Sequence, residues 1–307
     1  MSFELEEKLV IAIASSALFD LSESDKIFQK EGVKKYEEYQ KSNLSVVLDK
    51  GIAFPFIKRL LSLNKIDSEN KPIEVILLSR NSINTGLRVF RSISEYDLDI
   101  TRAAFFSGSS PYKYIPTYSA SLFLSANEAD VKEAIKQGYP AGQVFGSKTI
   151  DDDDDSELRI AFDFDGVIAS DESEIVYKER GIKMYHEYEK NHANQPLDIG
   201  PVGDLLKKVS KIQEKERTYS LLNPKYKPKL RTSIVTARNA PAHERVITTL
   251  DHLGIEVDEA FFLGNILKKN ILDIMKPHIF FDDQKTHLLD LNNVPAVHIP
   301  FGIANIK

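Results

Sequence analysis

Short apolar runs alternate with amphipathic stretches along most of the chain. The runs 158–164 (LRIAFDF) and 232–237 (TSIVTA) are rich in branched side chains and bounded by polar residues, which is typical of buried strands. Residues 204–213 repeat apolar positions at helical spacing, and 175–189 is predicted helical with an interruption near Gly181. Strands separated by helices favour parallel pairing through right-handed crossovers, so we predict an α/β fold of Rossmann-like three-layer units.

This pattern occurs twice. Residues 9–41 and 158–190 align without a gap, with 11 identities in 33 positions. Three further pairs of segments correspond downstream in the same order: ILLSRN with SIVTARN, AAFFSG with EAFFLG, and LFLSAN with IFFDDQ. We therefore predict a duplicated α/β unit, with one copy over 1–150 and the other over 157–307.

An acidic run separates the copies. Asp151 to Asp155 are five consecutive aspartates, followed by Ser156. Adjacent negative charges repel one another and stay in water, so we predict a solvated linker over 151–156. A calcium loop is the alternative, but the run lacks the alternating spacing and the glycine of such a loop.

Paired aspartates follow two of the predicted strands. Asp163 and Asp165 come at the end of one strand, and Asp282 and Asp283 follow the apolar run HIFF. The carboxyl ends of parallel strands meet at one edge of a sheet, so all four carboxylates can share a site. Oxygen ligands suit a hard cation such as Mg²⁺. Each pair could instead cap the helix that follows, but two pairs at strand ends favour a metal site.

A hydroxyl and two lysines add phosphate-binding groups. Thr236 ends a third predicted strand, and Lys268 and Lys269 lie downstream. A hydroxyl donor and an ammonium beside a metal–carboxylate cluster together make a phosphate pocket. Taken singly, the threonine is ordinary strand composition and each lysine is an ordinary helix surface residue.

Composition excludes several classes of protein. The net charge of −6 and pI of about 5.7 argue against a general binder of nucleic acid or anionic membranes. The absence of cysteine excludes disulfides, thiolate zinc sites and a cysteine nucleophile. The apolar run 9–19 is too short to span a bilayer and follows acidic residues, so we expect a cytoplasmic protein. The seven histidines show no metal-binding pair and are interpreted as surface or core residues.

The motif order DFDGV, a strand ending in threonine, a lysine and then DD resembles haloacid dehalogenase-like phosphohydrolases. DFDGVIASDESE, IVTARNA and KPHIFFDDQ, together with SSALFDL, AFPF, LFLSAN and HIPFG, are similar to the cytosolic 5′-nucleotidase type I family over nearly the whole chain. That family commonly has Gly-Asp-Ala where this chain has Phe164-Asp165-Gly166, although both aspartates are kept.

The resemblance implies Mg²⁺-dependent hydrolysis of nucleoside 5′-monophosphates of the AMP or IMP type through an aspartyl-phosphate. Asp163 would be the nucleophile and Asp165 the general acid and base. Thr236 and Lys268 would bind the phosphoryl group, with Lys269 as the reserve candidate. The resemblance assigns the metal to the Asp163 side chain, the Asp165 backbone carbonyl and Asp282. Asp283 would either bind the metal directly or contact the residues that bind it.

The roughly sixty residues after Asp165 exceed a tight crossover, and we predict a helical cap around 171–230. Asp171, Glu172, Arg238 and Asn239 are the candidate substrate contacts. A phosphatase for another small phosphate monoester, or a nucleotide-sensing module with vestigial hydrolysis, is the alternative function. An oligomer is compatible with the sequence.

The first copy lacks the catalytic carboxylates. Ala14 and Ser16 stand where the second copy has Asp163 and Asp165, and Ser125-Ala126 stand where it has Asp282-Asp283. We predict that this copy is non-catalytic, and that it completes the nucleotide pocket or binds a nucleotide effector.

Overall fold

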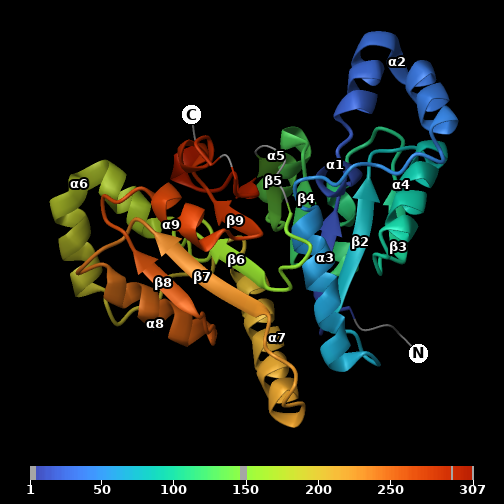
Figure 1. The fold of residues 1–307 in the computed structure, drawn as a ribbon. Coiled ribbons are helices and arrows are strands. Elements are labelled where there is room, and N and C mark those ends of the chain that lie inside the picture. Colours follow the sequence, from blue (N-terminus) through green and yellow to red (C-terminus); the bar gives the residue numbers. More distant parts are fainter. Residues whose placement is uncertain (1–4, 146–150, 292, 306–307) are drawn as a thin grey trace. The chain divides into compact units, whose positions relative to one another are not determined.

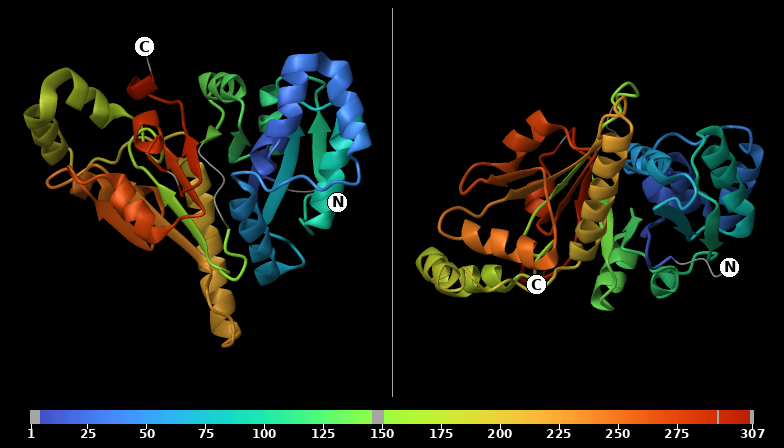
Figure 2. Two further views of the ribbon diagram at one scale, coloured as in Figure 1. Left: turned by 45° about the horizontal axis from the view of Figure 1, so that its top comes forward. Right: turned by 90° about the horizontal axis from the view of Figure 1, so that it is seen from below.

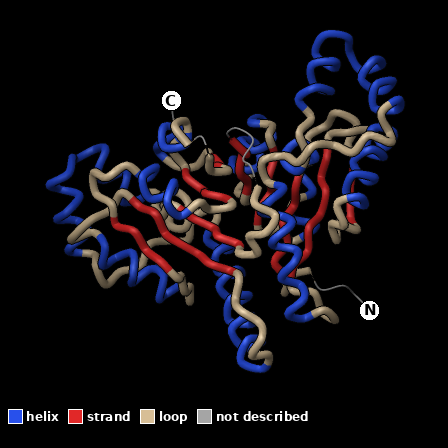
Figure 3. Tube along the Cα trace, viewed as in Figure 1, coloured by secondary structure: helices blue, strands red, loops and turns tan. Residues whose placement is uncertain are grey.

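The computed structural model describes residues 5–145, 151–291 and 293–305 (Figure 1). The chain divides into two compact units, Met1–Tyr139 and Pro140–Lys307, called the first and second unit below. Each contains a mostly parallel sheet with helices beside it (Figure 3), so the α/β prediction is confirmed. Among the described residues, no helix is both long and apolar enough to cross a membrane.

The first unit has a four-stranded parallel sheet in the order β3-β2-β1-β4. Its strands are β1 (Leu9–Ile13), β2 (Ile73–Ser79), β3 (Arg102–Phe105) and β4 (Leu122–Ser125). Its helices are α1 (Ser15–Leu18), α2 (Ser22–Ser42), α3 (Phe54–Ser62), α4 (Ile83–Glu95) and α5 (Glu128–Lys136), with short 3₁₀ turns at η1 (Leu63–Asp67), η2 (Tyr112–Tyr114) and η3 (Pro116–Tyr118). Every residue of β1 is buried, as its unbroken apolar sequence predicts.

The second unit has strands in the order β5-β10-β9-β6-β7-β8, parallel except for the β10–β5 pair. Its strands are β5 (Ala141–Phe145), β6 (Leu158–Phe162), β7 (Leu230–Thr236), β8 (Glu259–Phe262), β9 (Ile279–Asp282) and β10 (Ala296–His298). Its helices are α6 (Glu172–Asn191), α7 (Gly203–Leu222), α8 (His243–Leu253), α9 (Lys268–Met275) and α10 (Lys285–Leu288), with a 3₁₀ turn at η4 (Ile303–Asn305).

The two units share one topology, as the sequence repeat predicts. The order β8-β7-β6-β9 in the second unit repeats the order β3-β2-β1-β4 of the first. The first long helix of each unit also bends at a glycine (Figure 2): α2 at Gly32 with φ 82°, and α6 at Gly181 with φ 77°. A positive φ is accessible to glycine at little cost, which explains why both copies have this residue at the bend.

The helix predicted for 204–213 is confirmed as part of α7, and its apolar stripe is buried. Leu205, Leu206, Val209 and Ile212 are at most 4% exposed, and the helix packs against β7. The region predicted as a cap therefore contains one helix, α7, that lies on the sheet. The other helix, α6, bends at Gly181 and contacts α8.

Candidate active site

The predicted catalytic residues come from three adjacent strand ends. Asp163 follows β6, Thr236 ends β7 and Asp282 ends β9. Phe162 on β6 is in register with Ile234 on β7 and with Phe281 on β9. The rings of Phe162 and Phe281 stack with centroids 5.1 Å apart, which fixes the two strands that carry the aspartates.

Lys268 forms ion pairs with both Asp163 and Asp282. It is the first residue of α9, and its Nζ lies 2.6 Å from Oδ2 of Asp163 and 2.7 Å from Oδ2 of Asp282. All three side chains are buried. Lys269, the other candidate, is half-buried, whereas Lys268 is the lysine that contacts both aspartates.

Asp163, Asp282 and Asp283, which we call the acidic cluster, place three buried carboxyl groups beside this lysine. Burial raises the pKa of Asp163 to about 7, with Lys268 opposing the shift and Asp282 adding to it. Burial also favours the neutral form of Asp282, but Lys268 and His287 outweigh it and lower its pKa. The single ammonium group of Lys268 therefore does not neutralise the three carboxylates of the acidic cluster.

Asp283 is the residue of the acidic cluster whose carboxyl group has no hydrogen-bond donor among the described residues. Both of its carboxylate oxygens are buried and accept no hydrogen bond from the described part of the chain. Burial raises the pKa of Asp283 to about 10, and the charges of Asp163 and Asp282 add to the rise. An added cation would satisfy these oxygens and return the carboxyl group to its ionised form.

Gly166 is required by this arrangement. Its φ is 69°, and a Cβ added there would lie 2.8 Å from Cγ of Asp283. A side chain would therefore be strained in the backbone and would also collide with the carboxyl group. The glycine of DFDGV allows the turn after Asp165 to rest directly on Asp283.

His287 is a site residue that the sequence interpretation missed. Its Nδ1 lies 3.1 Å from Oδ2 of Asp282, and potential ligand atoms of Asp163, Asp282 and His287 lie within 4.8 Å of one another. The sequence signal was its position five residues after Asp282, in the first turn after the strand. No spacing rule for histidine pairs detects such a residue.

The donor set of this edge fits a hard divalent cation. Most of the possible ligand atoms are carboxylate oxygens, which such a cation prefers. The carboxyl group of Asp283 is buried without a hydrogen-bond donor in the described ranges of the chain, and Asp163 and Asp282 both contact Lys268. Asp163, Asp282 and Asp283 are the side chains that could hold the ion.

Asp165 is held by an arginine. Nε and Nη2 of Arg238 each donate a hydrogen bond of 2.7 Å to a different oxygen of Asp165. The guanidinium also lies over the ring of Phe164, 5.2 Å from its centroid. Arg238 is only 3% exposed, so its first role is to orient Asp165 rather than to present a charge to solvent.

Helix α6 holds this arginine through a buried glutamate. Nη1 of Arg238 donates to Oε2 of Glu189, which is fully buried, and Nη2 donates to Oγ of Ser173 at 2.7 Å. Nη1 of Arg245 donates to the other oxygen of Glu189 at 3.1 Å. We call Asp165, Arg238, Glu189, Arg245 and Glu172 the arginine–glutamate network, since Nη2 of Arg245 also lies 2.9 Å from Glu172.

The remaining candidate residues have different surroundings. Oδ2 of Asp171 accepts a hydrogen bond from the backbone of Ile303, so this side chain holds the C-terminal segment. Glu172 pairs with Tyr188 and Arg245; burial raises its pKa, but these two partners outweigh that effect and lower it. Asn239 is exposed next to Gly264. Thr236 is buried, and its Oγ1 accepts a hydrogen bond from the backbone of Arg238, which leaves the hydroxyl proton available to another acceptor.

Comparison with known proteins identifies the family of this chain. The family model described as 5′-nucleotidase matches residues 1–306. The human protein named Cytosolic 5′-nucleotidase 1B is 36% identical over 288 residues, which is 91% of this chain and 46% of the human protein. This chain thus spans about half the length of that curated relative.

A solved structure, "Structure of Pnkp1/Rnl/Hen1 complex", contains a chain with a TM-score of 0.33 and 16% identity, covering 96% of this chain and 97% of that one. So low a similarity carries no argument about function. The family model and the human relative are sufficient: this chain belongs to the 5′-nucleotidase family.

Proposed function

We propose that this chain is a phosphoric monoester hydrolase that converts nucleoside 5′-monophosphates of the AMP or IMP type to nucleoside and phosphate. The observation that carries the proposal is the contact of Lys268 with Asp163 and Asp282 at adjacent strand ends. Family membership and the name of the human relative support the substrate class. The same name and the absence of cysteine support a cytoplasmic location.

Asp163 is the nucleophile in this proposal. One of its oxygens attacks phosphorus, the bond from phosphorus to the 5′-oxygen breaks, and an aspartyl-phosphate forms. Oδ1 accepts a hydrogen bond of 2.7 Å from the backbone of Phe164 and Oδ2 contacts Lys268, so the carboxylate is fixed before substrate binds. Fixing the attacking oxygen removes part of the entropy cost of the step.

Asp165 is the general acid and general base in this proposal. It donates a proton to the departing 5′-oxygen, and it then accepts one from the water that cleaves the aspartyl-phosphate. Both of its oxygens are bonded to Arg238 in this structure. The proposal therefore requires one of these two hydrogen bonds to open when the nucleotide is bound.

Lys268 and Thr236 bind the transferred group. The Lys268 ammonium neutralises charge on a phosphoryl oxygen, and the Thr236 hydroxyl donates a hydrogen bond to another. Burial opposes the charged form of Lys268, but Asp163 and Asp282 outweigh it and raise its pKa, so the ammonium persists in this buried position.

Mg²⁺ would be held by Asp163, Asp282 and Asp283, together with the backbone carbonyl of Asp165. Bound there, it would neutralise the charge that the carboxylate and the phosphate otherwise present to each other. His287 keeps Asp282 oriented through the contact at 3.1 Å.

The test is phosphate release by the full chain from a panel of nucleoside monophosphates, sugar phosphates and other small monoesters, with Mg²⁺ and with EDTA. We expect activity on the nucleotides, dependence on Mg²⁺, and loss in Asp165→Ala. Ser16→Ala, at the matching position of the first unit, is the control and should keep full activity. Preference for sugar phosphates would contradict the substrate class, and no turnover of any ester would contradict the enzyme.

A further inference from the structure

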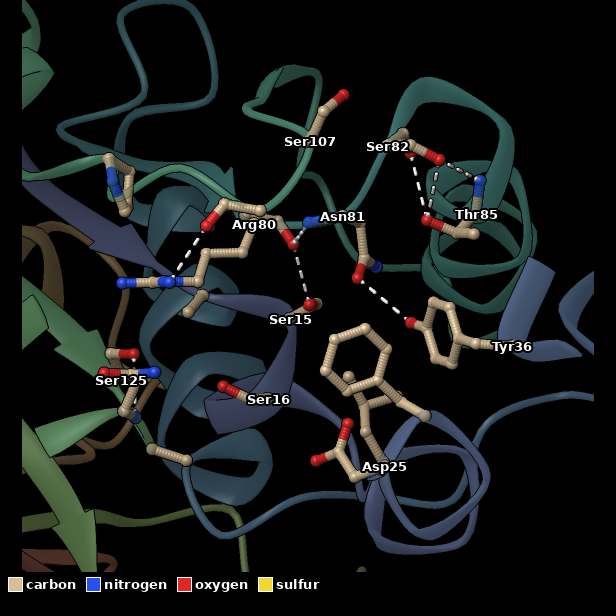
Figure 4. Close-up of a pocket in the computed structure, with 18 of the residues that line it drawn as sticks. Ser15, Ser16, Asp25, Tyr36, Arg80, Asn81, Ser82, Thr85, Ser107 and Ser125 are labelled. Carbon is tan, nitrogen blue, oxygen red and sulfur yellow. Dashed lines mark hydrogen bonds between the residues drawn. The ribbon is translucent and has the colours of Figure 1, made fainter. Parts of the chain in front are cut away.

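The first unit contains a cavity of about 600 Å³ at the edge that corresponds to the candidate active site (Figure 4). Ser15 and Ser16 follow β1, Ser79 ends β2 and Ser125 ends β4, and all four line the cavity. Helix α2 supplies another wall with Asp25, Phe28, Val33, Tyr36 and Glu37. The volume is within the range of small-molecule sites.

The groups for phosphoryl transfer are absent from this cavity. Ala14, Ser16, Ser125 and Ala126 line it at the positions that Asp163, Asp165, Asp282 and Asp283 hold in the second unit. The hydroxyls of Ser15 and Ser79 bond to each other at 2.8 Å. The strand ends that border this cavity therefore supply neither the aspartate nucleophile nor the carboxylate ligands that the second unit has at these positions.

An aromatic pair is common to both units. Phe28 and Tyr36 meet edge to face with centroids 5.8 Å apart at 80°, and Tyr177 and Tyr185 do the same at 5.9 Å and 76°. Phe28 and Tyr177 are each 49% exposed. In the second unit this pair lies near the candidate active site. Burial raises the pKa of Tyr185, and the charges of Arg238 and Asp165 are close enough to affect this pKa as well.

The arginine of this cavity, Arg80, has different partners from its counterpart Arg238 in the second unit. Nε and Nη2 of Arg80 bond to the carboxylate of Asp130 on α5, and Nη1 donates to the carbonyl of Gly108 at 2.9 Å. Figure 4 shows Arg80 and Tyr36 on opposite sides of the space. In the second unit, Arg238 instead bonds to Asp165 and Glu189, whereas the matching positions here are Ser16 and Gln40 and offer no carboxylate.

The remaining charges disfavour a phosphate. The lining has three acids, Asp25, Glu37 and Asp130, against the single cation Arg80. A phosphate dianion would enter a negative field with its only cation already paired. An uncharged ligand avoids this repulsion, and its hydroxyl groups can donate to the carboxylates and serine side chains.

We propose that the first unit is a binding site for an uncharged nucleoside. The base stacks on Phe28 and Tyr36, and the sugar hydroxyls face Ser16, Asp25 and Glu37. Tyr36 is held for this contact by the hydrogen bond from its hydroxyl to Oδ1 of Asn81 at 3.1 Å. The inference rests on the proposed function, in which the second unit releases a nucleoside as product.

The test is calorimetric titration of the full chain, in EDTA, with adenosine, cytidine and their 5′-monophosphates. Phe28→Ala removes the exposed aromatic of the first unit, and Tyr177→Ala is the matched change in the second. We expect Phe28→Ala to weaken nucleoside binding at least about tenfold, as for loss of a stacking ring. Tyr177→Ala should retain this binding. At the first unit, measured as the binding that is lost in Phe28→Ala, each monophosphate should bind at least about tenfold more weakly than its nucleoside.

The second variant combines Asp25→Asn with Glu37→Gln, which removes two negative charges from the cavity. In this variant the difference in affinity between a nucleoside and its monophosphate should become smaller. Nucleoside binding that is unchanged in Phe28→Ala, or lost in Tyr177→Ala, would overturn the proposal. So would monophosphates that bind as tightly as nucleosides and are lost in Phe28→Ala. Nucleoside binding without hydrolysis of any monophosphate would refute the proposed function alone; hydrolysis without binding sensitive to Phe28→Ala would refute only this inference.

Discussion

Arg238 binds both carboxylate oxygens of Asp165, with hydrogen bonds of 2.7 Å from Nε and from Nη2. Such paired bonds fix the plane of a carboxylate as well as its position. The arginine is itself fixed by Glu189 and Ser173 of helix α6. The orientation of the proposed acid–base residue therefore depends on a helix that begins seven residues further along the chain.

We predict that Arg238→Lys lowers kcat roughly tenfold or more while KM changes little. Lysine keeps the charge but cannot bond both oxygens at once, so Asp165 loses its orientation and with it part of its acid–base contribution. Steady-state kinetics across pH measure the effect. Arg80→Lys in the first unit is the control. An unchanged kcat would show that Arg238 does not position Asp165.

Glu189→Gln should destabilise the chain by about 3 kcal/mol. Glu189 is fully buried and is the shared partner of Arg238 and Arg245, so removal of its charge leaves two buried guanidinium groups less well neutralised. Urea unfolding followed by circular dichroism gives the free energy.

The matched control is Gln40→Ala, which removes an uncharged hydrogen bond of 3.2 Å from Arg88 and should cost about 1 kcal/mol. Equal losses in the two variants would argue against a special role for the glutamate charge.

Gly166→Ala should destabilise the chain more than Gly254→Ala. Both glycines have positive φ, 69° and 65°, so both substitutions carry a backbone cost of about 1 kcal/mol. Only at Gly166 does the new Cβ also meet another group, the carboxyl of Asp283 at 2.8 Å. Thermal unfolding of the two variants separates the collision from the backbone strain, and equal shifts in Tm would contradict the close approach.

Without metal, stability should fall as pH rises from about 4 to 7. Burial raises the pKa of Asp163 to about 7 and that of Asp283 to about 10, so the folded chain binds more protons than the unfolded chain across this range. The slope is at most about 1.4 kcal/mol per pH unit for each group. The lowered pKa of Asp282 acts in the opposite direction, but only below about pH 4.

Thermal unfolding in EDTA from pH 5 to 8 measures this slope, and Mg²⁺ should reduce it by favouring the ionised carboxylates. Asp283→Asn should flatten the slope in EDTA. Stability that rises with pH in EDTA would show that the acidic cluster is already balanced by Lys268.

The strand ends of the site could be predicted from sequence, because apolar runs fix the strands and parallel pairing brings their carboxyl ends to one edge. We predicted that Asp163, Thr236 and Asp282 follow strands that end at one edge of a sheet, and the structure has these strands side by side. The internal repeat likewise predicted the shared strand order of the two units.

The side-chain partners could not be predicted in the same way. His287 contacts Asp282 from a short helix after the strand, and Glu189 reaches Arg238 from the far end of α6. Both contacts depend on how a bent helix or a turn packs on the sheet, which local periodicity does not encode. Arg80 and Arg238 follow similar strands in similar sequences, yet they bond to different acids because Ser16 and Gln40 replace the carboxylates.

The most direct test of the account is to find where phosphate is attached during turnover. The full chain is mixed with Mg²⁺ and a nucleoside 5′-monophosphate labelled with ³²P, quenched in acid within one turnover, and digested for peptide mapping. We predict label on the peptide containing Asp163, lost in alkali and absent from Asp163→Asn. Phosphate release by Asp163→Asn at the rate of the unmodified chain, or label attached elsewhere, would contradict it.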